Sequence, residues 1–322
     1  MAPPTQAELG QLGKIFFPHA TDQQERVAAK GTRFVHYTSA EAARSMIKHG
    51  EVWLRQPTCM KDYSEVQHGL SCLSAAYKHS EPGKKMQALL DRLFPDLRAK
   101  LEREFDQHAQ NFSSGTYLVC VSEHDDREDE TGRLSMWRAY SRGTGVAIVL
   151  KSEPFFGTSD ALKAYFSPVA YLDDNEFAVE LSRVVANLER ESAFVGRFEE
   201  RLVQTYLFNA FRYAALCTKH PGFSEEREWR VIYAPHLYSS QHMIKDDQVI
   251  EGVPQLIYKL PLRDIPQEGL TGIGVAALVD RVIIGPTEYP MPMWGAFVDL
   301  LGSAGMAEPW KRVVCSNIPL RT

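Results

Sequence analysis

The stretch Pro221-Gly-Phe-Ser-Glu-Glu-Arg-Glu-Trp-Arg-Val-Ile-Tyr233 places three carboxylates at the entrance to a short apolar segment. Pro221 and Gly222 are residues that end a helix and set the direction of a turn. The segment that starts at Glu228 has the composition of a strand. In an extended chain, Glu226 and Glu228 would point to the same face of a sheet. Like charges so close repel, so this pattern indicates a compensating cation, an arginine or a substrate.

Two interpretations of the Glu226 and Glu228 pair follow from its chemistry. In the functional one, one carboxylate hydrogen-bonds a ribose hydroxyl and stabilises an oxocarbenium-like transition state, while the other orients or activates an acceptor. In the structural one, the stretch is a solvated acidic turn whose ion-pair partner is Arg230. The sequence leaves both open and does not rank the two glutamates.

The composition is that of a globular protein without strong charge. The chain has 322 residues, of which 44% are hydrophobic, and its formal net charge is -5. This charge gives no general attraction to nucleic acid or to an anionic membrane. No apolar run approaches the roughly 20 residues of a membrane span, and residues 1–8 lack the pattern of a signal peptide. The five scattered cysteines are expected to be reduced thiols in a cytoplasmic protein.

Hydrophobic periodicity predicts strands at both ends of the chain and helices between them. Strands are expected at 32–38, 51–55, 115–122, 146–150, 164–172, 228–233, 255–260, 280–285 and 311–316, and helical blocks at 84–112 and 175–217. Ser39 is expected to cap a further helix that ends at Gly50, and Pro95 is expected to kink or split the first helical block. Residues 239–253 are polar and are expected to form a loop. We therefore expect a short N-terminal helix and arm over residues 1–30. Residues 31–322 are expected to form a single α+β domain with a mixed, mainly antiparallel sheet covered by two helical insertions.

The first predicted strand carries polar side chains on both faces. Alternation places His36 and Thr38 on one face and Tyr37 on the other. His36 could hold a ribose or phosphate oxygen, with Thr38 beside it. The alternative is a core histidine bonded to a backbone carbonyl.

The segment Ser135-Met-Trp-Arg-Ala-Tyr140 is expected to be a short helix. Trp137 and Tyr140 are three residues apart and share a face, where they could stack a planar ring such as nicotinamide or adenine. The alternative is that both are core residues. The acidic loop 123–130 lacks the ligand spacing of a calcium loop and is expected to be solvated.

A turn at Met60-Lys-Asp-Tyr-Ser-Glu65 is expected to open a helix. Asp62 and Glu65 have the spacing of a capping box, and a minority alternative places them in a cleft.

Several of these blocks together resemble a bacterial family known as domain of unknown function 2971 (DUF2971). The blocks that carry the resemblance, in chain order, are 35–39, 50–55, 60–65, 135–140 with 145–148, Lys219 with 223–230, 282–286 and 318–321. At one place the chain departs from the family pattern: Lys61 stands where the family usually has an asparagine before the aspartate. This resemblance covers most of the chain but implies no chemistry by itself.

A weaker resemblance is to the layout of ADP-ribosyltransferases. It implies that His36 grips the nicotinamide-side ribose, that Ser135 or Tyr140 shapes the nicotinamide pocket, and that Glu226 or Glu228 bonds the ribose 2′-hydroxyl while nicotinamide leaves. Tyr37, Thr38, Trp137 and Arg230 complete the set expected to contact NAD, which would be the substrate. Long helical segments between the blocks and the lack of a clear Ser-Thr-Ser motif are departures from that layout.

Two classes of function therefore stand. The first is an NAD-dependent ADP-ribosyltransferase-like enzyme that transfers ADP-ribose to a protein or nucleic-acid acceptor or hydrolyses NAD, in a bacterial defence or toxin system. The alternative is a non-catalytic binding or sensing protein of a defence or stress system. A nuclease is disfavoured, because the sequence shows no carboxylate set for metal binding and no net positive charge.

Overall fold

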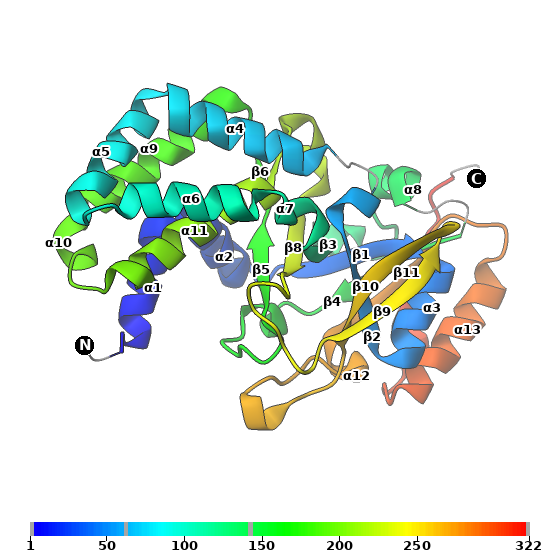
Figure 1. Ribbon diagram of the computed structural model, residues 1–322. Coiled ribbons are helices and arrows are strands. Elements are labelled where there is room, and N and C mark those ends of the chain that lie inside the picture. Colours follow the sequence, from blue (N-terminus) through cyan, green and yellow to red (C-terminus); the bar gives the residue numbers. More distant parts are fainter. Residues whose placement is uncertain (1–2, 61–63, 141–143, 320–322) are drawn as a thin grey trace. The chain divides into compact units, whose positions relative to one another are not determined.

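The computed structural model describes residues 3–60, 64–140 and 144–319 (Figure 1). Contacts within the chain group these residues into two compact units that interleave along the sequence. The helical unit comprises Met1–Arg26, Gln56–Thr116 and Ser167–Ser224. The sheet unit comprises Val27–Arg55, Tyr117–Phe166 and Glu225–Thr322. The expected division into an N-terminal segment, residues 1–30, and a single domain, residues 31–322, remains a prediction.

The helical unit gathers both predicted helical blocks and most of the N-terminal segment. Pro95 separates two helices, as the sequence predicts, and the second block is interrupted near Ser192. Its elements are α1 (Gln6–Phe16), most of α2 (Pro18–Lys30), α4 (Glu65–His79), α5 (Glu81–Leu93), α6 (Leu97–Ala109), α7 (Asn111–Ser114), α9 (Asp174–Arg190), α10 (Ser192–Val195), α11 (Glu200–Leu216), β6 (Ala170–Tyr171) and β7 (Thr218–Lys219).

The sheet unit is built on ten strands among the described residues, in the order β12-β11-β4-β1-β3-β2-β10-β9, with β8 paired to β3 and β5. The pairs along this path, together with β3–β8, are antiparallel apart from the parallel pair β11–β12, which confirms the predicted mixed, mainly antiparallel sheet. The strands are β1 (Arg33–Ser39), β2 (Glu51–Arg55), β3 (Tyr117–His124), β4 (Gly145–Leu150), β5 (Ala164–Pro168), β8 (Glu228–Tyr233), β9 (Ile244–Ile250), β10 (Val253–Pro261), β11 (Val279–Ile284) and β12 (Val313–Cys315).

Local sequence signals account for the connection between β1 and β2. The Ser39 side chain accepts a hydrogen bond from the Ala42 backbone and caps α3 (Ala40–His49). Gly50 ends that helix in the left-handed conformation, with φ of 61°, which glycine adopts without steric cost. The other helices of this unit are α8 (Leu134–Tyr140), α12 (Val275–Leu278) and α13 (Pro290–Ser303).

The centre of the sheet is forked, because β1 and β2 share one edge of β3. Ser122 pairs with Val35 of β1 on one side and with β8 on the other. Leu118 pairs with Arg55 of β2 on the same edge of β3 that holds β1, and with Ile232 of β8 on the opposite edge. The strands β1 and β2 therefore diverge on either side of Cys120, while β8 follows the opposite edge of β3 without interruption.

Strand register assigns each central side chain to one of two faces. Residues opposite each other in an antiparallel pair point to the same face. The Phe34 face carries Phe34, His36, Thr38, Val121, Glu123, Ile148 and Trp229. The Glu228 face carries Val35, Tyr37, Cys120, Ser122, Ala147, Glu228 and Arg230.

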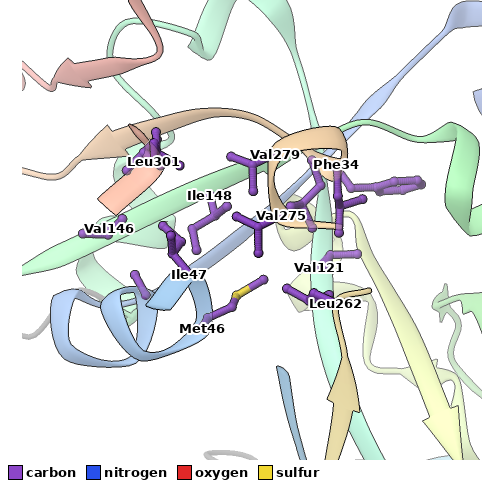
Figure 2. Close-up of a cluster of buried hydrophobic side chains, with 14 of the residues drawn as sticks. Phe34, Met46, Ile47, Val121, Val146, Ile148, Leu262, Val275, Val279 and Leu301 are labelled. Carbon is purple, nitrogen blue, oxygen red and sulfur yellow. The ribbon is translucent and has the colours of Figure 1, made fainter. Parts of the chain in front are cut away.

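The Phe34 face holds the large apolar core of the sheet unit. Side chains of α3, α12 and α13 pack there against the strands, and Figure 2 shows Phe34, Ile148 and Val279 within this cluster. Phe34 makes edge contacts with Phe155, Phe166 and Trp229, with ring centroids 5.0–5.4 Å apart. On the Glu228 face, a smaller cluster packs α8 through Met136 and Trp137 against β1.

Two predictions of local structure were wrong. Residues 244–250 form the edge strand β9, although 239–253 were expected to be a loop, because pairing with β10 outweighs a polar sequence. The N-terminal segment contains two helices rather than one short helix and an arm. Thr5 and Glu8 form a capping box that begins α1.

Candidate functional site

The corner before β8 is not an extended strand. Residues Pro221–Glu226 form a 3-10 helix, and Arg227 has φ of 45°, in the left-handed region that non-glycine residues rarely adopt. β8 begins at Glu228, as predicted. The expectation that Glu226 and Glu228 share a sheet face through strand alternation was therefore wrong, because only Glu228 belongs to the strand.

Glu228 and Arg230 form a buried ion pair on the Glu228 face. Arg230 Nε donates to Glu228 Oε1 at 2.7 Å, and the two residues are 2% and 6% exposed respectively. A charge-assisted hydrogen bond of this length fixes the orientation of the carboxylate. Arg230 is therefore the compensating arginine that the sequence pattern indicates.

Glu226 is held by a different partner. The Tyr140 hydroxyl, at the end of α8, donates to Glu226 Oε1 at 3.2 Å. The structure thus brings one residue of the predicted aromatic helix to one of the two predicted carboxylates. Glu226 is half-buried, in contrast to the buried Glu228.

Arg133 organises this corner, and the sequence interpretation missed it. Its guanidinium donates to the carbonyls of Glu225 and Glu123 at 2.9 Å, and to both carboxylate oxygens of Glu128 at 2.9 and 3.0 Å. Its backbone N–H donates to the Tyr37 hydroxyl at 2.8 Å. An arginine between an acidic loop and a short helix is the only signal of this role in the sequence.

Three further residues predicted for the site, Trp137 and Ser135 of α8 and Tyr37 of β1, have buried functional groups. Trp137 is 1% exposed, donates from Nε1 to the Thr131 carbonyl, and meets Tyr37 edge to face at 4.9 Å. Both rings are thus packed in the core, which corresponds to the core alternative for Trp137. Burial raises the pKa of Tyr37 to about 12, so its hydroxyl stays neutral at physiological pH. Ser135 Oγ is buried and has no hydrogen-bond partner among the described residues.

His36 and Thr38 lie on the opposite face from Glu228. His36 pairs with Ile148, which belongs to the Phe34-face core. Its Nδ1 lies 2.9 Å from the Cys120 carbonyl, at the fork between β1 and β2, and donates to it. Burial lowers the pKa of His36, and the hydrogen bond to Cys120 opposes that shift. The structure therefore does not bring His36 face to face with Glu228.

The acidic loop after β3 was expected to be solvated, and this holds for only part of it, because Asp126, Arg127 and Glu130 are exposed whereas Asp129 is largely covered. Arg33 binds Asp280 and Asp126 at 2.5 Å and Asp129 at 2.8 Å. Asp129 also accepts from His124 Nε2 at 2.8 Å, and the His124 side chain is fully buried. Arg281 of β11 also pairs with Asp129 at 3.3 Å, so ion pairs tie the loop to β1 and β11, while the Asp126 side chain remains 88% exposed.

The remaining predicted block lies partly outside the described residues. Lys61, Asp62 and Tyr63 are among the residues that the structure does not describe, so the Asp62 capping box stays a prediction. Glu65 begins α4 and pairs with the buried Lys219 at 2.6 Å within the helical unit. The five cysteines are free thiols, as predicted.

The fold and this corner define a mixed α/β protein with a buried acid–arginine pair at the centre of its sheet. A family model described as "Protein of unknown function (DUF2971)" matches residues 136–231, which confirms the DUF2971 resemblance over that segment. The matched segment contains most of α8, the helical block 174–216 and the start of β8. Comparisons with curated proteins and with solved structures found no match. None of the described helices is long and apolar enough to cross a membrane.

Proposed function

We propose that the chain is an ADP-ribosyltransferase-like protein that acts on NAD through residues of the Glu228 face. The observation that supports this proposal most is the buried Glu228–Arg230 pair at 2.7 Å beside the Tyr140–Glu226 contact. A buried carboxylate with a fixed orientation is suited to stabilising a cationic ribose, because the low local dielectric strengthens that interaction.

The roles follow from the position of each group. Glu228 hydrogen-bonds the ribose 2′-hydroxyl and stabilises the oxocarbenium-like transition state as the bond to nicotinamide breaks. Glu226, held by Tyr140, orients the acceptor or the hydrolytic water that attacks the opposite face of the ribose. Ser135 Oγ, which has no hydrogen-bond partner in the described part of the chain, is able to bond the nicotinamide amide, which carries both a donor and an acceptor. Arg230 positions Glu228.

His36 takes a different role from the one that the ADP-ribosyltransferase layout implies. With Nδ1 donating to the Cys120 carbonyl, the neutral ring presents Nε2 as an acceptor on the Phe34 face. In this proposal His36 holds β1 to β3 at the fork, and the ribose contact is assigned to Glu228 alone.

The second candidate is a non-catalytic binding or sensing protein. It is favoured by the same ion pair, because Arg230 occupies one carboxylate oxygen of Glu228 and both side chains are buried. In that case the pair would be a structural element, and its loss would change stability without a catalytic effect.

The test incubates purified protein with NAD and a cell lysate and measures free nicotinamide and ADP-ribose adducts. We expect wild type to release nicotinamide and Glu228→Gln to be slower by roughly a hundredfold to a thousandfold. Glu225→Gln is the matched control, because Glu225 is an exposed carboxylate of the same corner.

Each outcome separates the two candidates, once each variant is confirmed as folded by its circular dichroism spectrum. Loss of nicotinamide release in Glu228→Gln but not in Glu225→Gln supports the enzyme. Equal release by all three proteins, or no release by any of them, rejects the enzyme and leaves the binding protein.

A further inference from the structure

A buried arginine of the helical unit has no counter-ion among the residues that the structure describes. Arg212 of α11 is 1% exposed. Among the described residues its Nε has no hydrogen-bond partner, and no carboxylate forms an ion pair with it. Its guanidinium carbon lies 4.8 Å from the centre of the Tyr213 ring, and this cation–π contact compensates only part of the charge.

This charge cannot be removed by loss of a proton. A buried lysine or histidine can become neutral, whereas arginine keeps its proton in proteins. An isolated buried cation is unfavourable unless an anion with good geometry accompanies it. The buried charge of Arg212 therefore indicates that an anion from outside the described residues binds next to it.

Asn209 adds a second unsatisfied group next to this arginine. It lies three residues before Arg212, so the two side chains share a face of α11. Asn209 Nδ2 donates to the Thr205 carbonyl at 2.9 Å, and Asn209 Oδ1 is buried and has no partner within residues 3–60, 64–140 and 144–319. A cationic donor and an uncharged acceptor thus lie side by side.

We propose that Arg212 and Asn209 form a binding site for inorganic hydrogen phosphate. Its anionic oxygens would accept from the Arg212 guanidinium, and its remaining O–H would donate to Asn209 Oδ1. The 1% exposure of Arg212 favours a small free anion over the phosphate of a larger ester. Sulfate has the same shape but no O–H at neutral pH, so it leaves Asn209 unsatisfied. This site is independent of the proposed NAD chemistry.

The experiment measures the melting temperature of the full chain with and without 20 mM inorganic phosphate, after dialysis into a phosphate-free buffer. We expect phosphate to raise the melting temperature of wild type by roughly 2 °C or more, because it binds only the folded state. Sulfate at equal ionic strength is expected to produce a smaller rise.

Two variants on the same helix serve as comparison. Arg212→Met removes the charge and is expected to lose the phosphate-specific rise, whereas Arg201→Met, at an exposed position, keeps it. The same phosphate-induced rise in Arg212→Met as in wild type, or no rise in wild type, overturns the proposal. If Arg212→Met does not fold, equilibrium dialysis of wild type with radiolabelled phosphate decides: one bound phosphate per chain supports the site, and none overturns it.

Discussion

The two faces of the central sheet differ in what they bury. The Phe34 face buries apolar side chains from β1, β4, β11, α3 and α13, and the Phe34 and Phe166 rings on it have centroids 5.0 Å apart. The Glu228 face buries a smaller apolar cluster beside an ion pair and an arginine with several hydrogen bonds. Apolar packing stabilises a fold without chemistry, whereas buried charges cost free energy and need a reason. This difference is the reason that we propose a site on the Glu228 face.

The largest effect on stability is expected from the Phe34 face. Phe34→Ala removes a fully buried ring that contacts Phe155, Phe166 and Trp229, and should lower the free energy of unfolding by about 3–5 kcal/mol. Chemical denaturation followed by circular dichroism measures it. Tyr289→Ala, at a 60% exposed ring, is the control and should change the stability by no more than about 0.5 kcal/mol. A loss below about 1 kcal/mol in Phe34→Ala would mean that this face is not the main core.

On the Glu228 face, Arg230→Met should lower the free energy of unfolding by about 3 kcal/mol, because it removes the cation that binds the buried Glu228 carboxylate at 2.7 Å. The double variant Glu228→Leu/Arg230→Met should recover much of that loss, since neither charge remains. A double-mutant cycle gives the coupling energy of the pair, expected above about 1 kcal/mol. Additive losses would show that the two side chains do not act as a pair.

A smaller loss is expected from Arg133→Lys, which tests the corner without removing a charge. Lysine cannot reproduce the fork that joins Glu128 to the carbonyls of Glu123 and Glu225, so we expect a loss of about 2 kcal/mol. Hydrogen exchange should also become faster at residues 223–228. Unchanged exchange there would contradict the assignment of Arg133 as the residue that holds the corner.

The smallest effect concerns pH and His36. Burial lowers the pKa of His36 in the folded state, so below about pH 6.5 the unfolded chain binds the proton more readily than the folded chain. The contribution of His36 to the free energy of unfolding is therefore fully present above pH 6.5. It falls as the pH drops, by at most about 1.4 kcal/mol per pH unit. His36→Gln should show a shallower decline between pH 7 and pH 5 than wild type. A slope that is the same in both proteins would exclude His36 as a contributor.

Sequence patterns predicted the elements whose signals are local. The Ser39 cap, the Gly50 helix end, the break at Pro95 and the start of β8 at Glu228 depend on neighbouring residues and were confirmed. The edge strand β9 was missed because its pairing with β10 depends on contacts that a polar sequence does not reveal.

The site was predicted in composition but not in geometry. The residue types at Glu228, Arg230, Tyr140 and Glu226 suggested a charged site, and the structure joins them in two pairs. The left-handed φ of Arg227 is not visible in the sequence, because a non-glycine residue gives no signal for it. The alternation rule therefore failed for Glu226, which lies in the 3-10 helix before Arg227, and the same rule placed His36 correctly on the face opposite Tyr37.

The most direct test of the account is an electron-density map of crystals soaked with NAD. We predict density for the nicotinamide ribose with its 2′-hydroxyl within hydrogen-bond distance of the Glu228 carboxylate, and with Ser135 and Tyr140 nearby. Density next to His36 on the Phe34 face, or a map without NAD at saturating concentration, would contradict the assignment of the site to the Glu228 face.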